Sequence, residues 1–359
     1  METKRKPFYE KLSFNLISIA LILTALYLGQ GVILPILFSV LLSTLLLPVV
    51  NFLVAKRIPK AVSILLPLLV SIVVVAGILF LLSRQIIYFF DDSEMLKTRF
   101  TEFATQAQEW LGNQLGLSEA KQADYLEDGM SKLKTLAPKA MSATFLSLTG
   151  LLTFTLLIPI YTFLILFYKE TIKKFLVDSF SNASERRVEG ILFESTMVAR
   201  AYVLGLFIET VLVFALNVVG FLILGIRYAV FLALLAALLN NIPYIGIMVA
   251  NVICILITLV SSENATDAIW VGAILGVVQF LDNNFGMPLI VGNKVKINAL
   301  VTIVGILIGG VICGVPGMFL AIPGLAVMKI IFEKIDDTKP WAVLLSDQTS
   351  EKKVKKLKL

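Results

Sequence analysis

The chain has 359 residues, of which 58% are hydrophobic and 16% are charged, with a formal net charge of +6 at pH 7. A soluble domain carries roughly 25% charged residues, and here the mean hydropathy reaches +0.91. This composition excludes an ordinary soluble domain. The long apolar runs predict a polytopic α-helical membrane protein instead of a β-barrel, whose strands would alternate over short segments.

Histidine is absent, and the two cysteines, Cys254 and Cys313, lie far apart in apolar runs. The absence of histidine removes His-based acid–base catalysis, His metal ligands and His proton relays together. We interpret both cysteines as small hydrophobic residues and not as a disulfide or metal pair. We therefore expect no enzymatic activity, no cofactor and no metal site. The positive charge lies largely near the termini, which suits an anionic inner leaflet and gives little support for nucleic-acid binding.

Three apolar spans are predicted in the first part of the chain, at 12–28, 32–54 and 61–83. The first follows a basic stretch but lacks a small-residue cleavage site, so we interpret it as an uncleaved span with a cytoplasmic N-terminus. The short basic loop at 55–60 is then cytoplasmic as well, in agreement with the positive-inside rule.

The composition changes at 84–144, where acidic residues outnumber basic ones and the topology places the chain outside the cytoplasm. Apolar residues recur there at spacings of three and four, which predicts an extracytoplasmic insert of two amphipathic helices. A fourth span follows at 145–168, and the basic segment at 169–200 predicts a cytoplasmic helical loop. Arg200 and Arg227 are expected to mark membrane boundaries.

The remaining apolar runs are uneven in length. The runs at 201–224 and 268–291 predict two more full spans. The run at 228–260 is too long for one ordinary helix, and each arm on either side of its break, about 12–14 residues, is too short to cross a bilayer alone. A re-entrant hairpin from outside fits the charges, since it leaves Lys294 and Lys296 in the cytoplasm.

The run at 299–332 is also too long and broken in its middle, and predicts a second re-entrant hairpin, this one from the cytoplasm. The expected fold is therefore an all-α polytopic membrane protein with about six full transmembrane helices, two re-entrant broken-helix hairpins and an extracytoplasmic helical insert, or about eight hydrophobic segments in all. A basic cytoplasmic tail ends the chain. The corresponding domain boundaries are 1–83, 84–144, 145–168, 169–200, 201–334 for the transport domain, and 335–359.

Two carboxylates lie deep in predicted spans, Asp282 and Glu209. A buried, unpaired carboxylate costs several kcal/mol, so each is expected to be protonated, paired or ion-bound. Asn283 adjoins Asp282, and Gln279 is expected to share its helix face. We therefore predict that these residues bind a substrate or ion. The alternative is a structural role, in which each carboxyl caps broken backbone or bridges helices.

The two hairpin tips supply the other candidate residues. In the first tip, freed carbonyls and asparagine amides are suited to binding a cation or polar ligand; its members are Asn240, Asn241, Pro243, Tyr244 and Gly246. The second tip is a predicted hinge that also permits close helix packing; its members are Gly309, Gly310, Gly314, Pro316 and Gly317. Pro288 and Gly292 are grouped with the hinge, although we expect them to end a helix.

An internal repeat is also indicated. A shift of 73 residues aligns Glu209 with Asp282 and Pro243 with Pro316. In each half a carboxylate-bearing span precedes a broken hairpin, and the two spans run in opposite directions. We interpret this layout as an inverted-topology repeat, the arrangement that places substrate sites near the bilayer midplane in many transporters.

Three stretches carry a family resemblance: LLNNIPYIG at 238–246, VVQFLDNNFGMPLIVGNKV at 277–295, and GGVICGVPGMFLAIPGLAVMK at 309–329. In this combination and order they resemble the autoinducer-2 exporter-like permease family. The family often has a His-Pro pair where this chain has Asn298 and Ala299. The resemblance implies a bacterial cytoplasmic-membrane transporter that forms a homo-oligomer, such as a pentamer. It implies small-molecule export in some members and sodium/proton exchange in others.

The function expected first is a secondary transporter that exports a small polar organic molecule, such as a furanone signal. The chain has no G-x-x-x-x-G-K-[ST] loop, which leaves a gradient as the driving force. The alternative is cation/proton antiport through Asp282 and Glu209. A third hypothesis is a non-transporting scaffold or receptor whose working part is the acidic insert, and deletion of 93–136 would distinguish it. An intramembrane enzyme is expected least.

Overall fold

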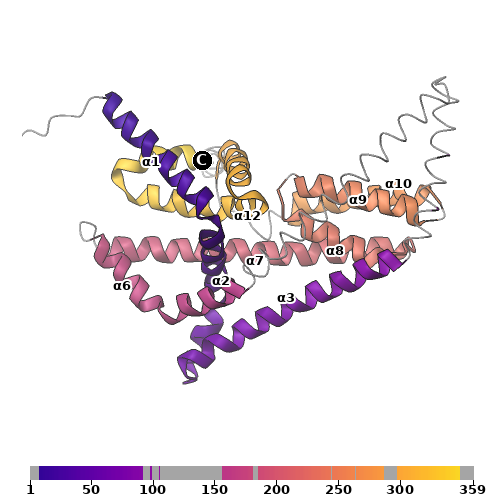
Figure 1. The fold of residues 1–359 in the computed structure, drawn as a ribbon, viewed down its shortest axis with the longest axis horizontal. Coiled ribbons are helices and arrows are strands. Elements are labelled where there is room, and N and C mark those ends of the chain that lie inside the picture. Colours follow the sequence, from indigo (N-terminus) through magenta and orange to yellow (C-terminus); the bar gives the residue numbers. More distant parts are fainter. Residues whose placement is uncertain are drawn as a thin grey trace, which may run out of the picture. The chain divides into compact units, whose positions relative to one another are not determined.

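The computed structural model describes residues 8–91, 98, 105, 156–180, 185–243, 245–262, 264–286 and 297–347. These residues are almost entirely helical (Figure 1), and their one β feature is an isolated bridge between Ile297 and Ser346. Five of the described helices are long and apolar enough to cross a bilayer, and shorter apolar helices accompany them. The all-α polytopic fold class is therefore confirmed. The predicted insert lies largely outside the described residues.

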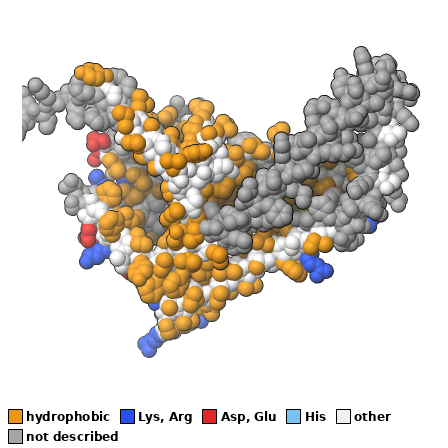
Figure 2. All heavy atoms as spheres, viewed as in Figure 1, with side chains coloured by type: hydrophobic (Ala, Val, Ile, Leu, Met, Phe, Trp, Pro, Cys, Tyr) orange, Lys and Arg blue, Asp and Glu red, His pale blue; other side chains and the backbone are white. Residues whose placement is uncertain are grey.

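Hydrophobic side chains cover most of the coloured surface in the view of Figure 2, whereas Lys, Arg, Asp and Glu side chains are sparse there. A soluble monomer rarely exposes apolar patches beyond a few hundred Å². Exposed valine and leucine side chains along one helix, such as Leu69, Val73 and Leu79 of α3 (Lys60–Asp91), show the same pattern. These surfaces are those of helices that face lipid.

The described chain divides into two compact units, which we call the first and second unit. The first contains residues 8–69, 157–206 and 297–347, and the second contains residues 70–91 and 207–286. α3 and α7 (Glu185–Ile223) each contribute to both. The first hairpin thus belongs to the second unit and the second hairpin to the first unit. The predicted domain boundaries stay a prediction.

In the first unit, α1 (Phe8–Leu28) and α2 (Gln30–Ala55) are separated only at Gly29, because α2 already begins at Gln30. A buried apolar cluster joins α2, α3 and the helix Leu156–Phe167; its members are Leu46, Val50, Ile64, Leu68 and Leu166. Pro35, Pro48 and Pro67 lie inside helices, as membrane helices tolerate. This cluster packs together the ends of the predicted second, third and fourth spans that the charge pattern assigns to the cytoplasm.

α6 (Lys169–Ser179) follows, and then the 39-residue α7. At 1.5 Å per residue α7 is about 58 Å long. It therefore joins the predicted cytoplasmic helical loop to the predicted fifth span without interruption.

Besides the C-terminal part of α3, the second unit contains the C-terminal half of α7, α8 (Ala229–Asn240), α9 (Ile245–Ser261) and α10 (Thr266–Leu281). α9 packs against both α8 and α10 (Figure 1). Their shared core includes Phe221, Tyr228, Leu232, Cys254 and Val271. α10 continues directly into a π-helical turn, η1 (Asp282–Gly286).

α8 and α9 form the first predicted hairpin. They contact each other along their lengths and are joined only by the turn after Asn240. A Cβ atom on Gly246 would lie 1.8 Å from the carbonyl oxygen of Leu239, so only glycine allows the first turn of α9 to lie this close to the end of α8. With 12 residues, α8 is about 18 Å long, shorter than the roughly 30 Å apolar core of a bilayer.

α12 (Ala299–Lys334) forms the second predicted hairpin. Its 36 residues are long enough to cross a bilayer, but the chain reverses at Gly314, which has φ 63° and ψ −151°. The two arms meet, since a Cβ atom on Gly309 would lie 2.5 Å from the carbonyl oxygen of Gly317. A straight helix would hold these two residues about 12 Å apart. Both broken runs are therefore helical hairpins, while their re-entrant placement in a membrane stays a prediction.

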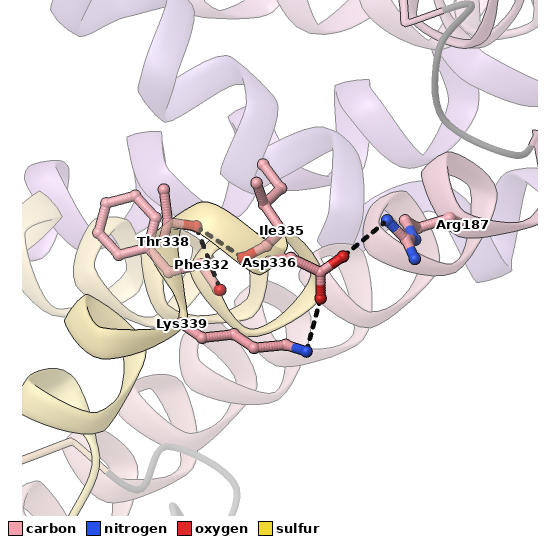
Figure 3. Close-up of polar contacts among 6 residues, drawn as sticks. All are labelled: Arg187, Phe332, Ile335, Asp336, Thr338 and Lys339. Carbon is pink, nitrogen blue, oxygen red and sulfur yellow. Dashed lines mark hydrogen bonds and ion pairs between the residues drawn. The ribbon is translucent and has the colours of Figure 1, made fainter. Parts of the chain in front are cut away.

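The chain after α12 folds back on the first unit through η3 (Asp336–Thr338) and α13 (Lys339–Leu345). The backbone N–H of Asn298 donates to the carbonyl of Leu345 at 2.9 Å, and the Asn298 side chain caps α12 by accepting from Leu300. Asp336 pairs with Lys339 at 2.6 Å and with Arg187 of α7 at 3.9 Å (Figure 3). These contacts tie the C-terminal segment to the beginning of the second hairpin and to α7.

Candidate functional site

Glu209, Asn240 and Asp282 come together in the second unit, and we call them the carboxylate cluster. Glu209 lies on the uninterrupted α7, Asn240 is the last residue of α8, and Asp282 is the first residue of η1. Two of the three therefore lie where a helix is interrupted. Such interruptions free backbone groups and let side chains of neighbouring helices converge.

One side-chain amide bridges the two carboxylates. The Asn240 Nδ2 donates to Oε1 of Glu209 at 3.4 Å and to Oδ2 of Asp282 at 3.4 Å. Both distances exceed the usual 2.7–3.2 Å of an N–H···O hydrogen bond, so each bond is weak. The carboxylates are buried, with exposed fractions of 8% for Glu209 and 3% for Asp282. Their other oxygens, Oε2 of Glu209 and Oδ1 of Asp282, have no hydrogen-bond partner among the described residues.

This geometry limits the charge that the carboxylate cluster can carry. Two carboxylates that share a buried site cannot both be ionised without a strong penalty from desolvation and mutual repulsion. A proton on one of them removes most of that penalty, and so does a bound cation. The unsatisfied oxygens of Glu209 and Asp282 are suited to either, because each retains lone pairs that no donor in the described part of the chain uses. The cluster can therefore hold a proton or a cation.

The neighbouring Asn241 holds this arrangement in place. Its Nδ2 donates to Oγ1 of Thr210 at 2.9 Å, and Oγ1 of Thr210 lies 3.1 Å from Oδ1 of Asn241. The same amide also contacts the carbonyls of Ala237 and Leu238 at the end of α8. Asn241 thereby fastens the first hairpin to α7 one residue from Glu209, and Asn240 is left facing the two carboxylates.

Gly286 is a residue of the site that the sequence analysis did not single out. A Cβ atom there would lie 2.6 Å from Oδ1 of Asp282, so the Asp282 side chain rests over Gly286. Both lie in η1, and π-helical turns within α-helices are frequent at functional sites. Its signal in the sequence is a glycine four residues after a carboxylate in an apolar run, within residues 277–295.

Other predicted residues are placed elsewhere. Gln279 donates to Oδ1 of Asn283 at 3.1 Å on an exposed part of α10 and η1, and neither hydrogen-bonds to Asp282 among the described contacts. Pro243 lies in the turn between α8 and α9, where its carbonyl accepts from Ile245. Gly246 permits the close return of the hairpin. Tyr244, Pro288 and Gly292 lie outside the described residues.

The predicted second-tip residues all lie within α12 of the first unit. Gly314 reverses the chain, and Pro316 and Gly317 begin the returning arm. Gly309 approaches Gly317, while Gly310 approaches the side chain of Met318. These close approaches are typical of a tightly packed hairpin. They agree with the expectation that the glycines of the second tip permit close helix packing. A role in binding and the internal repeat both stay predictions.

The family follows from comparison of the whole chain. The sequence model of the AI-2E family transporters matches residues 16–337. The chain belongs to the AI-2E transporter family. The carboxylate cluster and both hairpins lie inside the matched range, and so does the cap residue Asn298.

Relatives within the AI-2E family cover nearly the full chain. "Putative transport protein MT0215" of Mycobacterium tuberculosis is 26% identical over 321 residues, which is 87% of this chain and 85% of the relative. YueF of Bacillus subtilis, which carries a name of the same kind, is 28% identical over 317 residues, or 84% and 83%. "AI-2 transport protein TqsA" of Escherichia coli is 25% identical over 350 residues, or 93% and 94%. This AI-2E chain is therefore a multi-pass membrane transporter or permease.

Proposed function

We propose that this transporter is driven by an ion gradient that acts at the carboxylate cluster, and that it exports a small polar organic molecule. The observation that carries the proposal is the single amide of Asn240 placed between the buried carboxylates of Glu209 and Asp282. Ionisable residues at membrane depth are expensive to maintain and mark substrate or ion pathways. The proposal places the transporter in a bacterial cytoplasmic membrane, with both termini in the cytoplasm.

The coupling follows from the charge states of the pair. With both carboxylates ionised, repulsion between Glu209 and Asp282 favours a state in which water or a cation reaches them. With one proton or one cation bound, the cluster carries one negative charge less and can be enclosed. The doubly ionised cluster favours an open conformation, and the cluster with a bound proton or cation favours a closed one. An ion gradient can therefore drive a conformational cycle. The interrupted helices that end at Asn240 and Asp282 are the elements best suited to move.

The cargo is proposed on different grounds. The name of the Escherichia coli relative states that it transports AI-2, and that relative aligns with nearly the whole chain. A small polar organic solute of the furanone type is therefore the cargo to test first.

The proposed assembly is a homo-oligomer.

A second candidate function is cation/proton antiport without an organic cargo. It is favoured by the unsatisfied oxygens of Glu209 and Asp282, which are suited to exchanging a proton for a cation at one place. The two candidates share the carboxylate cluster and differ in what else crosses the membrane.

The test is flux in proteoliposomes that contain the purified protein, an internal pH dye and an imposed sodium gradient. The variants are Asp282→Asn and Glu209→Gln, with Asp267→Asn as a matched control, since Asp267 lies on α10 but outside the carboxylate cluster. Antiport predicts sodium-driven proton movement that stops in both cluster variants and persists in the control. Export predicts efflux of a labelled furanone-type solute whose dependence on a proton or sodium gradient is lost in the same two variants. Wild-type rates in both variants under both assays would rule out coupling at the cluster.

A further inference from the structure

A cavity of about 680 Å³ lies in the first unit, apart from the residues of the carboxylate cluster. It is bounded by α2, the helix Leu156–Phe167, α6 and the N-terminal half of α7. Part of its lining is apolar and includes Leu47, Ile165 and Leu192, which we call the apolar wall. The lining also includes three cationic side chains, Lys169, Lys173 and Arg200, and two carboxylates, Glu170 and Glu189. The cavity thus combines apolar surface with charged groups whose formal charges sum to +1.

The two lysines already have partners. Nζ of Lys169 donates to Oδ1 of Asn51 at 2.8 Å and lies 3.9 Å from Glu170. Nζ of Lys173 lies 2.7 Å from Glu189. Arg200 differs, because its Nε is buried and has no hydrogen-bond partner among the described residues. A guanidinium carries five N–H donors, and a buried donor without a partner is costly. Arg200 is therefore the cation of the cavity for which the described residues show no anionic partner.

Arg200 also lies farther from the charged N-terminal turns of α7 than Glu189 does. It follows Glu189 by eleven positions on α7, which is about 16 Å along the helix axis. The side chains of Glu170 and Glu189 are 72% and 42% exposed, and that of Lys173 is 49% exposed. The apolar part of α7 begins immediately after Arg200, whereas its N-terminal turns carry Arg186 and Arg187. The cavity therefore crosses the level at which this unit changes from charged to apolar.

We propose that this cavity binds an anionic phospholipid of the cytoplasmic leaflet, with the lipid phosphate on Arg200 and an acyl chain along the apolar wall. The planar guanidinium matches a phosphate with two parallel hydrogen bonds, which an ammonium group cannot reproduce. Basic pockets between transmembrane helices on the cytoplasmic side are suited to lipid head groups. The apolar wall favours a lipid over a soluble phosphate, which would leave that wall exposed to water. The inference does not depend on the carboxylate cluster.

The test measures lipid binding by the purified protein in detergent, by native mass spectrometry and by the shift in thermal unfolding. Phosphatidylglycerol is titrated against phosphatidylcholine with the same acyl chains, and inorganic phosphate is titrated separately. Wild type is expected to prefer phosphatidylglycerol, and Arg200→Gln is expected to lose about tenfold or more of that affinity. Arg200→Lys should retain part of it. Arg186→Gln is the matched control, because Arg186 lies exposed on the same helix outside the cavity.

Three results would overturn the proposal. One is equal binding of the two lipids by wild type, a comparison that needs no variant and stands even if Arg200→Gln fails to fold. Another is an equal loss of affinity for phosphatidylglycerol in Arg186→Gln and Arg200→Gln, which would indicate that the lipid is attracted by the overall charge only. In the third, inorganic phosphate alone raises the unfolding temperature of wild type fully, and phosphatidylglycerol raises it no further. That result would identify the site as one for a soluble anion.

Discussion

The side-chain amide nitrogen of Asn240 lies 3.4 Å from Oδ2 of Asp282, although 42 positions separate the two residues. The contact joins the end of α8 to the beginning of η1, so that two helix interruptions meet beside α7. Because the same nitrogen also contacts Glu209, one donor serves two buried carboxylates. The properties of this donor and of the backbone around Asp282 are therefore open to direct tests.

Replacement of Asn240 by leucine should remove the donor between the carboxylates and leave them facing each other without a bridge. We expect transport to fall by about tenfold or more and the free energy of unfolding to drop by about 1–3 kcal/mol. Flux and thermal unfolding measure the two effects. Asn217→Leu is the control, since the Asn217 amide is buried on α7 and its hydrogen bond among the described residues goes to its own helix, at the carbonyl of Val213. Wild-type flux in Asn240→Leu would show that the bridge is dispensable.

Gly286→Ala tests the position of the Asp282 side chain. The added Cβ would lie 2.6 Å from Oδ1 of Asp282, so the carboxylate must turn away while the backbone stays in place. We expect transport to fall severalfold with a loss of stability below about 1 kcal/mol, because the end of one short side chain gives way. Gly276→Ala on α10, where a Cβ meets nothing within 4 Å, should leave transport unchanged. An equal effect in both variants would contradict a specific role for Gly286.

Gly314→Ala tests the reversal in the second hairpin. Its φ of 63° with ψ of −151° is a backbone conformation essentially confined to glycine. We expect a loss of about 1–3 kcal/mol in the free energy of unfolding, together with reduced transport. Gly324→Ala, in the same helix at a position with nothing within 4 Å, should be tolerated. If the two variants unfold at the same temperature, α12 does not depend on this turn.

Asp336 makes a testable contribution to the pH dependence of stability. The hydrogen bond from Lys339, followed by the charges of Lys339 and Arg187, lowers the pKa of the Asp336 carboxyl below its ordinary value. A carboxyl with a lowered folded-state pKa stabilises the protein above its ordinary, unfolded-state pKa, and this stabilisation is lost as the pH falls through the folded-state pKa. The pairs shown in Figure 3 are exposed, so salt should weaken the effect.

The measurement is the melting temperature of wild type and Asp336→Asn at pH 7 and at about pH 3, in low and high salt. The difference between the two proteins should be present at pH 7 in low salt and should shrink at the acid pH and in high salt. Asp337→Asn is the control, because Asp337 makes none of the contacts of Asp336. A difference that is independent of pH would show that the ion pairs do not stabilise the C-terminal segment.

The sequence by itself determined the fold class, the breaks near Pro243 and Gly314, and the candidacy of Glu209 and Asp282. Hydrophobic length, prolines, glycines and isolated carboxylates in apolar runs are local signals, and a membrane makes them strong because few structures satisfy the backbone in lipid. The hairpins followed from the same length argument. The position of Arg200 at a membrane boundary was also a local inference.

Only the tertiary structure decided which of these groups meet. The sequence suggested Gln279 as a neighbour of Asp282 on the same helix, whereas the hydrogen-bond contact of Asp282 with Asn240 joins residues 42 positions apart. A helical period of 3.6 residues predicts neighbours within one helix only, so it carries no information about a contact between α8 and η1. The cavity around Arg200 likewise depends on four helices that are distant in the chain, and no local pattern carries that information.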